Sequence, residues 1–492
     1  MQAPKVIPTV LDFTKKPSHS ASSSFLQLRG DANATSRAES ISDVARVETV
    51  ESSATENEPV DDPELKLPKL KSLAIIILTN ALLQVSFFII VSSSSEYAAS
   101  LGGTATFSGL VIGIPTVFSG LTLIPLMKLD EGVYKRPLHL ACAASVLGNM
   151  LYGLAYKARF LYLILISRMV LGVSFAFWMY CKRYCSDPRI VGVRRRTALA
   201  GWLVVGQGSG FSVGPFLGGL LYRVGFKNEV FNGYTSPGWL MSAVWLAFWV
   251  AVALVFEDVK ATPPPPPRTT EIELSDVTSA SDPAPPSPRN TDRDEPKMTL
   301  QRWGVVVCMC WYAMTCFFIL GAWEANIPVY TGAKFHYSPF AAGNLIALGG
   351  ITTFPFLFAN LFLARRVQDR HTLAVGSAIG LAGLLIMIAF LQTDTVQFGT
   401  LYFCWFLVAL GFNLASTVTL SLLSKQLPGE WNGRISLAIQ YSNYTGRVTG
   451  AVWGGAGVKV GMLNYLGLQI AIVGIGAVMF LTLWRDLKAK TG

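Results

Sequence analysis

Charged residues are scarce in this sequence. Asp, Glu, Lys and Arg make up 14% of its 492 residues, whereas hydrophobic residues make up 51%. A soluble protein of this length is about one quarter charged, so much of the surface is expected to face lipid rather than water. Enzyme signatures are missing as well. With four histidines and no phosphate-binding Walker loop, nucleophile elbow or His/Cys cluster, the sequence indicates neither an enzyme, nor ATP drive, nor a metal or cofactor site.

Cysteines suited to disulfides are also missing. The seven cysteines fall within apolar stretches or at their basic ends, so we expect no structural disulfide. The net charge of +10 does not point to nucleic acid, because many of the basic residues flank apolar stretches. Membrane topology explains them better, and a nucleic-acid partner is not expected.

Long apolar stretches, by contrast, recur along the chain. A helix needs about 20 such residues to cross the ~30 Å hydrocarbon core of a bilayer. The stretches lack the alternating pattern of a barrel, so we predict an all-α membrane protein surrounded by lipid. Twelve transmembrane helices are expected at residues 73–93, 106–127, 138–156, 160–180, 197–221, 239–256, 303–322, 338–363, 372–391, 398–423, 433–454 and 463–484.

Polar segments divide these stretches into two blocks of six. Residues 1–71 and 486–492 are predicted to be cytosolic tails, and the first of them is expected to be disordered. Residues 257–302 are rich in Pro and Ser and are predicted to form a disordered cytosolic loop. This loop separates two predicted six-helix bundles, at 72–256 and 303–485.

The short loops differ in charge, and basic loops usually face the cytosol. One set of alternate loops carries most of the Lys and Arg residues, so we predict that this set and both termini are cytosolic. The basic residues of this set are Lys128, Lys135, Arg136, Lys182, Arg183, Arg189, Arg194, Arg195, Arg196, Arg365, Arg366, Arg370 and Lys425.

The two blocks resemble one another. Glu96 and Glu324 are expected to end the first and seventh spans. Glycines recur at identical spacing in the fifth and eleventh spans, at Gly210, Gly214, Gly218 and Gly219 and at Gly446, Gly450, Gly454 and Gly455. Matches at equivalent positions predict two pseudo-symmetric six-helix bundles, an architecture typical of transporters that work by alternating access.

Three motifs resemble those of the major facilitator superfamily, over nearly the whole membrane portion. They are Arg168 with Gly172 in the fourth span, Gly210 through Pro215 to Gly219 in the fifth span, and Asp369-Arg370 in a loop, with a degenerate copy at Asp130–Arg136. The fifth-span motif is that of the antiporter branch. The resemblance implies the major facilitator fold and export from the cytosol in exchange for protons.

A narrower resemblance is to eukaryotic vacuolar phosphate transporters that carry an SPX domain, and to their lysosomal relatives. It rests on Lys182-Arg183-Tyr184-Cys-Ser186-Asp187, on Glu324 and on Gly446-Arg447. Residues 1–71 leave no room for an SPX domain, so regulation through one is not expected. The resemblance implies phosphate or another small anion as cargo, and a vacuolar or lysosomal membrane.

Two arginines within the spans carry the sharpest hypothesis. Arg168 and Arg447 belong to opposite halves, and a charge in the membrane costs roughly 2.5–3.5 kcal/mol unless it meets a cavity or a partner. If both face one central cavity they form an anion site, because a guanidinium binds oxyanions through two parallel hydrogen bonds. In the alternative, Arg168 binds backbone carbonyls and Arg447 extends to the lipid headgroups.

Further residues are candidates for the same pathway. We predict substrate contacts from Lys182, Arg183, Tyr444, Gln207 and Asn443, with topology and helix packing as the alternatives. Glu96 and Glu324 are candidates for proton coupling, with helix capping as the alternative. The residues expected in gating, for which helix packing is the other interpretation, are Gly210, Gly214, Pro215, Gly218, Gly219, Asp369, Arg370, Gly446 and Gly450.

The sequence therefore predicts a monomeric secondary transporter, not an enzyme, that moves a small solute out of the cytosol by alternating access. Phosphate or another small anion is the first candidate, with protons as the coupling ion and a vacuolar or lysosomal membrane as the location. One alternative is an exporter of drugs or organic metabolites at the plasma membrane. An anion channel and a non-transporting nutrient sensor are alternatives from a different class.

Overall fold

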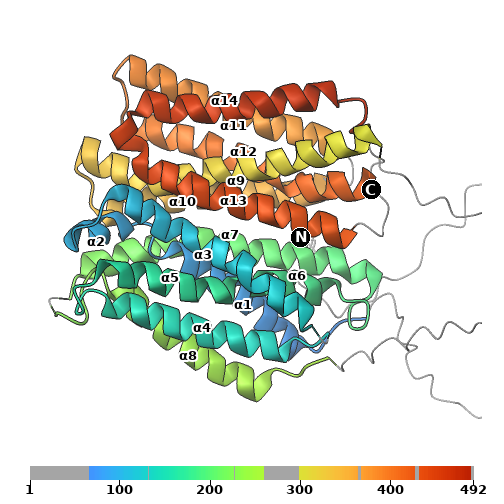
Figure 1. Ribbon diagram of the computed structural model, residues 1–492, viewed down its shortest axis with the longest axis horizontal. Helices are drawn as coiled ribbons and strands as arrows, with labels where there is room; N and C mark the ends of the chain where they lie inside the picture. The colour runs from blue at the N-terminus through green and yellow to red at the C-terminus, as the bar shows by residue number, and fades with distance from the viewer. Residues whose placement is uncertain are drawn as a thin grey trace, which may run out of the picture. The chain divides into compact units, whose positions relative to one another are not determined.

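The computed structural model describes residues 66–130, 132–226, 228–259, 299–363, 367–426 and 432–488. These residues form helices and the turns between them (Figure 1). The predicted disordered tail and central loop, the end of the C-terminal tail, and the loop residues Arg365 and Arg366 lie largely or wholly outside the described ranges.

Among the described residues, the N-terminal half forms eight helices that make six spans. The first span is broken after Phe88, and the fourth is interrupted at Ala176. The helices are α1 (Leu70–Phe88), α2 (Ser94–Ser100), α3 (Ala105–Lys128), α4 (Lys135–Leu154), α5 (Leu161–Phe175), α6 (Phe177–Ser186), α7 (Val193–Val224) and α8 (Ser236–Val255).

The described part of the C-terminal half forms one helix for each span. The helices are α9 (Leu300–Phe335), α10 (Pro339–Leu363), α11 (Asp369–Gln392), α12 (Phe398–Gln426), α13 (Asn432–Val460) and α14 (Met462–Thr482). Figure 1 shows the two halves side by side, the first coloured blue to green and the second yellow to red.

Ten helical segments of the described chain are long and apolar enough to cross a membrane. The other two spans are α7 and α13, with 32 and 29 residues. Glycine and polar residues lower their hydropathy, but their length exceeds the roughly 20 residues that a crossing needs. The predicted all-α fold of twelve spans in two six-helix bundles is therefore confirmed.

The seventh span is longer than the sequence suggested. We expected it to end near Glu324, but α9 continues to Phe335 and holds Glu324 in its interior, 1% exposed. That expectation was wrong because the apolar run stops at this charged residue. Its partner, Arg447, lies 123 positions further along the chain and gives no local signal.

Glycines in α7 and α13 bring each of these helices against the first helix of its own half. A Cβ atom on Gly214 would meet Phe88 of α1, and one on Gly450 would overlap the carbonyl of Phe318 in α9. The same holds for Gly210 and Gly218 beside α1 and for Gly446 and Gly454 beside α9. Equivalent glycines thus serve equivalent packing in the two halves, which supports the internal repeat.

The two halves contact each other mainly through α3 with α13 and α7 with α10. Small residues again allow close approach. A Cβ atom on Gly113 would meet Val448, and one on Gly343 would overlap the carbonyl of Pro215. The interface between the halves therefore consists of two tightly packed helix pairs.

The two ends of the helices differ in charge. The basic end is defined here by Lys69, Lys135, Lys182 and Arg189, and the far end by Glu96. At the basic end, Asp258 accepts hydrogen bonds of 2.9 and 2.8 Å from the amides of Tyr134 and Lys135 and so caps α4. The start of the predicted central loop is therefore attached to the first bundle.

The α9–α13 contact generates the first prediction. We expect Gly450→Ala to destabilise the folded protein by about 1–3 kcal/mol, because the added methyl group forces two backbones apart. The measurement is the thermal unfolding of detergent-purified protein. Gly467→Ala is the matched control, since nothing lies within 4 Å of a Cβ atom at Gly467. Equal unfolding temperatures for the two variants would contradict the close contact.

Candidate functional site

An ion pair lies buried between α9 and α13. The Nη1 atom of Arg447 donates a 3.1 Å hydrogen bond to Oε1 of Glu324, and its Nη2 atom pairs with Oε2. The two side chains are 8% and 2% exposed. Of the predicted anion-binding and proton-coupling residues, Arg447 and Glu324 are therefore held in direct contact.

Two aromatic rings at the end of α1 cover this pair. The guanidinium carbon of Arg447 lies 4.8 Å from the ring centre of Phe87 and 5.2 Å from that of Phe88. A guanidinium is attracted to the face of an aromatic ring. The two phenylalanines therefore shield the pair from water and add to its stabilisation.

Arg168 has a different environment. It is 1% exposed, and its Nε, Nη1 and Nη2 atoms donate to the carbonyls of Val111, Ser86 and Phe87 at 3.4, 3.3 and 3.4 Å. Two of these carbonyls belong to the last residues of α1, where a helix leaves acceptors unpaired. Arg168 therefore stabilises the break in the first span.

The two arginines predicted to share a cavity both lie near one ring, that of Phe87. The guanidinium carbon of Arg168 is 5.9 Å from the centre of Phe87, and that of Arg447 is 4.8 Å away. Arg168 is occupied with backbone carbonyls, as in the alternative interpretation of the sequence. It holds the carbonyls of Ser86 and Phe87, whereas Arg447 is paired with a carboxylate, that of Glu324.

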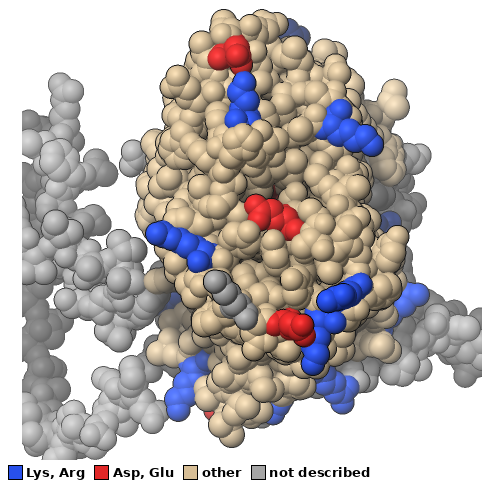
Figure 2. Space-filling view, turned by 90° about the vertical axis from the view of Figure 1, so that its left-hand side faces the viewer, with Lys and Arg blue, Asp and Glu red and all other residues tan. Residues whose placement is uncertain are grey.

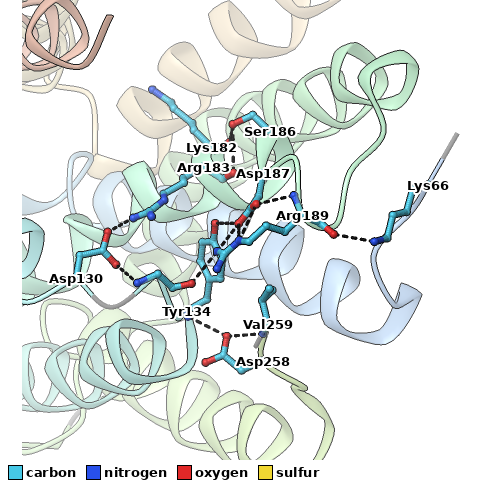
Figure 3. Close-up of polar contacts among 11 residues, drawn as sticks. Lys66, Asp130, Tyr134, Lys182, Arg183, Ser186, Asp187, Arg189, Asp258 and Val259 are labelled. Atoms are coloured by element: carbon cyan, nitrogen blue, oxygen red, sulfur yellow. Dashed lines mark hydrogen bonds and ion pairs between the residues drawn. The ribbon is translucent and has the colours of Figure 1, made fainter. Parts of the chain in front are cut away.

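Lys182 and Arg183 point in different directions at the basic end (Figure 3). Arg183 pairs with Asp130, whereas Lys182 is exposed, forms no ion pair within the described ranges, and extends toward the helices of the other half. An ammonium group without a carboxylate partner can attract an anion. Lys182 thus fits the predicted role better than Arg183.

A second ion pair holds the loop that follows α6. Arg189 donates to Asp187 at 2.6 Å and to the carbonyl of Gly132 at 2.7 Å, and Tyr134 donates to Asp187 at 2.8 Å (Figure 3). Burial alone would raise the pKa of the Asp187 carboxyl group, but the hydrogen bonds from Arg189 lower it below its usual value. These residues fix the basic end of the first bundle.

Gln207 and Asn443 face the interior between the halves. On α7, Val213 and Phe216 are 42% and 43% exposed, and Gln207 lies on the opposite face of the helix. On α13, Asn443 is one turn before Arg447, opposite the exposed Thr445. Both residues therefore lie on the faces expected for a substrate pathway.

Tyr444 serves a contact between the halves. Its hydroxyl lies 2.9 Å from Oγ of Ser119 in α3, and the neighbouring Tyr441 donates to the carbonyl of Gly120 at 3.0 Å. The side chain of Tyr444 is turned from the face that carries Asn443 and Arg447. It belongs to the α3–α13 interface.

Glu96 lines a polar cavity of about 400 Å³ between the halves at the far end. Its carboxylate accepts a 2.6 Å hydrogen bond from Tyr222. Ser92 and Pro328 also line the cavity. Pro328 lies one helical turn beyond Glu324 on α9, and Ser92 lies in the break between α1 and α2, four residues after Phe88. Figure 2 shows this end as a mostly uncharged surface with a hollow near its middle.

Asp369 and Arg370 lie at the basic end of the second bundle. Asp369 accepts hydrogen bonds from Ser421 at 2.7 Å and from Lys425 at 2.9 Å, which join α11 to α12. Arg370 donates to the carbonyl of Trp484 at 3.1 Å and lies 4.7 Å from its ring centre. These contacts connect helices within one half, as do those of Gly210, Gly214, Gly218, Gly446 and Gly450, whereas Gly219 lies against Phe340 of the other half.

Sequence reasoning missed three aromatic residues at the site: Phe87, Phe88 and Trp178. The ring of Trp178 stacks on Phe175 at 4.6 Å and lies 6.3 Å from Phe87. Aromatic residues in spans carry no distinguishing pattern. The available signal was the position of Trp178 one turn before Lys182, on the same face of α6.

Comparison with known proteins gives a consistent family assignment. A sequence profile described as Major Facilitator Superfamily matches residues 76–451. A protein of Schizosaccharomyces pombe named as an uncharacterized MFS-type transporter is 31% identical over 442 residues, 88% of this chain and 85% of that protein. An SPX domain-containing membrane protein of Arabidopsis thaliana is 32% identical over 202 residues, 41% of this chain and 28% of that protein.

Solved structures share the fold at low sequence identity. A POT family transporter in complex with a thioalcohol-conjugated peptide superposes with a TM-score of 0.63 at 12% identity, covering 87% of this chain and all of that one. A peptide transporter POT in complex with sulfate gives 0.61 at 16% identity, covering 85% and 95%. At these identities the likeness concerns the fold alone.

The buried ion pair generates the second prediction. We expect Glu324→Gln and Arg447→Gln each to destabilise the protein by about 3–5 kcal/mol, because each leaves one buried charge without a partner. The double variant should be destabilised by less than the sum, since it removes both charges. Thermal unfolding of the purified proteins measures these effects.

Lys69→Gln is the control for charge removal as such. Lys69 pairs with Glu257 at the surface, where the side chains are 69% and 60% exposed, so its loss should leave the unfolding temperature unchanged. Additive effects of the two single changes at Glu324 and Arg447 would show that the residues are not paired.

Proposed function

The chain belongs to the major facilitator superfamily and is a transporter of that type, and we propose that its cargo is a small anion, with inorganic phosphate as the first candidate. The observation that carries this proposal is the buried pair of Arg447 and Glu324 beneath Phe87 and Phe88. It provides a guanidinium inside the protein whose present partner is itself an anion. The sequence resemblance to vacuolar phosphate transporters with an SPX domain supports phosphate.

Anion binding at Arg447 requires that the ion pair with Glu324 be broken. A guanidinium binds a carboxylate and an inorganic oxyanion through the same parallel hydrogen bonds, so the two compete. When Glu324 takes up a proton, it loses its charge and Arg447 becomes available. A monovalent anion then restores the same net charge as the original pair, which avoids leaving a lone charge in a low-dielectric interior.

This exchange sets the direction of coupling. The anion and the proton occupy the site together, so they are carried in the same direction, in contrast to the exchange for protons that the fifth-span motif implies. Export from the cytosol into a vacuole or lysosome, which the sequence favours, then requires an anion gradient larger than the opposing proton gradient. Transport at the plasma membrane would follow the same rule, with net flow set by the two gradients.

The surroundings of the pair support alternating access. The far-end cavity, which Ser92 and Pro328 line, lies on one side of the pair. The exposed Lys182 lies on the other side, toward the basic end. Phe87 and Phe88 lie beside the pair and separate these two approaches. Rocking of the halves along the α3–α13 and α7–α10 contacts would open one approach as it closes the other.

Uptake of radiolabelled phosphate into proteoliposomes tests the proposal. Wild-type protein should accumulate phosphate when the outside is more acidic than the lumen. Arg447→Gln should reduce uptake at least tenfold, because loss of a charged hydrogen-bonding group costs about 1.5–3 kcal/mol. Glu324→Gln should keep exchange of phosphate for phosphate but lose the stimulation by the pH gradient, because glutamine cannot take up the proton.

Lys459→Gln on the exposed end of α13 is the control and should behave as wild type. Size-exclusion profiles identify variants that fail to fold. If Arg447→Gln does not fold, the pH dependence of phosphate uptake by the Glu324→Gln protein tests the proposal instead. Unchanged uptake by folded Arg447→Gln protein would overturn the proposal. Anion currents that reverse at the Nernst potential without any effect of pH would show a channel instead.

A further inference from the structure

We propose that Trp178 and Asn443 complete the anion site and make it selective for oxyanions that carry an O–H group, such as hydrogen phosphate, over those without one, such as sulfate. This inference rests on the proposed function, because it describes the same site. It starts from two buried polar atoms that find no hydrogen-bond partner within the described ranges, one a donor and the other an acceptor.

The donor is the indole N–H of Trp178 on α6. Its Nε1 atom is buried and unpaired, although a buried indole N–H usually finds an acceptor. The ring is held in place by Phe175, on which it stacks at 4.6 Å with an angle of 9° between the planes. It also lies 6.3 Å from Phe87, the ring that contacts Arg447 at 4.8 Å.

The acceptor is the side-chain oxygen of Asn443 on α13. Its Oδ1 atom is buried and no donor reaches it among the described residues. Asn443 precedes Arg447 by one helical turn on the same interior face, opposite the exposed Thr445 and Thr449. Trp178 therefore lies beside Phe87 in one half of the molecule, and Asn443 lies one helical turn from Arg447 in the other.

The polar groups near Phe87 and Arg447 differ in chemistry. Arg447, the N–H of Trp178 and the ammonium of Lys182, one turn from Trp178, all donate hydrogen bonds. Asn443 offers an acceptor. An anion that only accepts hydrogen bonds would satisfy the donors and leave Oδ1 of Asn443 buried and unpaired, which carries the cost of an unsatisfied polar group.

Phosphate and sulfate differ in whether they can donate a hydrogen bond to Asn443. At neutral pH phosphate retains at least one P–O–H group, which can donate to Asn443, whereas sulfate has no hydrogen to donate. Both have tetrahedral oxygen positions, so the charged groups alone do not distinguish them. An unsatisfied acceptor corresponds to about a tenfold loss of affinity. A site that hydrogen-bonds a substrate O–H group rejects the analogue that lacks it.

Competition for radiolabelled phosphate uptake in proteoliposomes tests the inference at pH 7. Arsenate carries an O–H group like phosphate, so it should inhibit wild-type uptake about ten times more strongly than sulfate. Asn443→Leu removes the acceptor and should bring the two inhibition constants close together. Trp178→Phe removes only the N–H donor, so it should weaken both inhibitors by similar factors and preserve their ratio.

Matched substitutions elsewhere serve as controls. Asn464→Leu changes an exposed asparagine that donates to the carbonyl of Val460 at the end of α13, and Trp453→Phe changes a tryptophan whose N–H is already bonded to the carbonyl of Tyr465. Neither should alter the ratio of the inhibition constants. If Asn443→Leu does not fold, Asn443→Ala removes the same acceptor with a smaller side chain.

The outcomes separate the inference from the proposed function. Equal inhibition of the wild type by arsenate and sulfate, or an unchanged ratio in the folded Asn443 variant, would overturn the selectivity while phosphate uptake through Arg447 stands. A changed ratio in Trp178→Phe would overturn the role assigned to its N–H group. Absence of phosphate uptake by the wild type would overturn the proposed function itself.

Discussion

A positive charge inside a membrane protein has to be neutralised where it lies, and here Glu324 does this for Arg447. The surrounding structure follows from that need. Side chains at Gly446 or Gly450 would hold α13 away from α9, so the glycines let the two charged groups meet. Phe87 and Phe88 then cover the pair and exclude water from it. The close packing of α9 on α13, the neutralisation of Arg447 and the exclusion of water from the interior all involve this one contact.

The position of the two phenylalanines depends on a break in the first span. Carbonyls at the end of α1 lose their helical partners there, and in a lipid environment they have to be satisfied by other groups. Arg168 supplies donors to Ser86 and Phe87 from α5. A second buried arginine is thus tied to the backbone, and its charge is used to keep an irregular segment in place. The two arginines have similar burial but separate tasks.

The fold could be predicted from the sequence because apolar length and glycine spacing are local signals, and even α7 and α13, which are less apolar, carry the repeated glycines. The site could be predicted only in part. Arg447 and Asn443 stand out in the sequence as candidates, since polar residues in spans are conspicuous. Glu324 was placed at a helix end because its partner is distant in sequence. Trp178 could not be identified, because what distinguishes it is an unpaired N–H group, which only the three-dimensional arrangement reveals.

The glycine contacts also divide the molecule into parts that can and cannot change during evolution. At Gly113, Gly343 and Gly450 any larger residue meets a neighbouring helix, so substitutions at these positions destabilise the fold. Gln207, Trp178 and Asn443 are not among the residues that these glycines contact. A lineage could therefore acquire a new cargo by replacing a few residues such as Gln207, Trp178 and Asn443, while the helices that carry them stay in register.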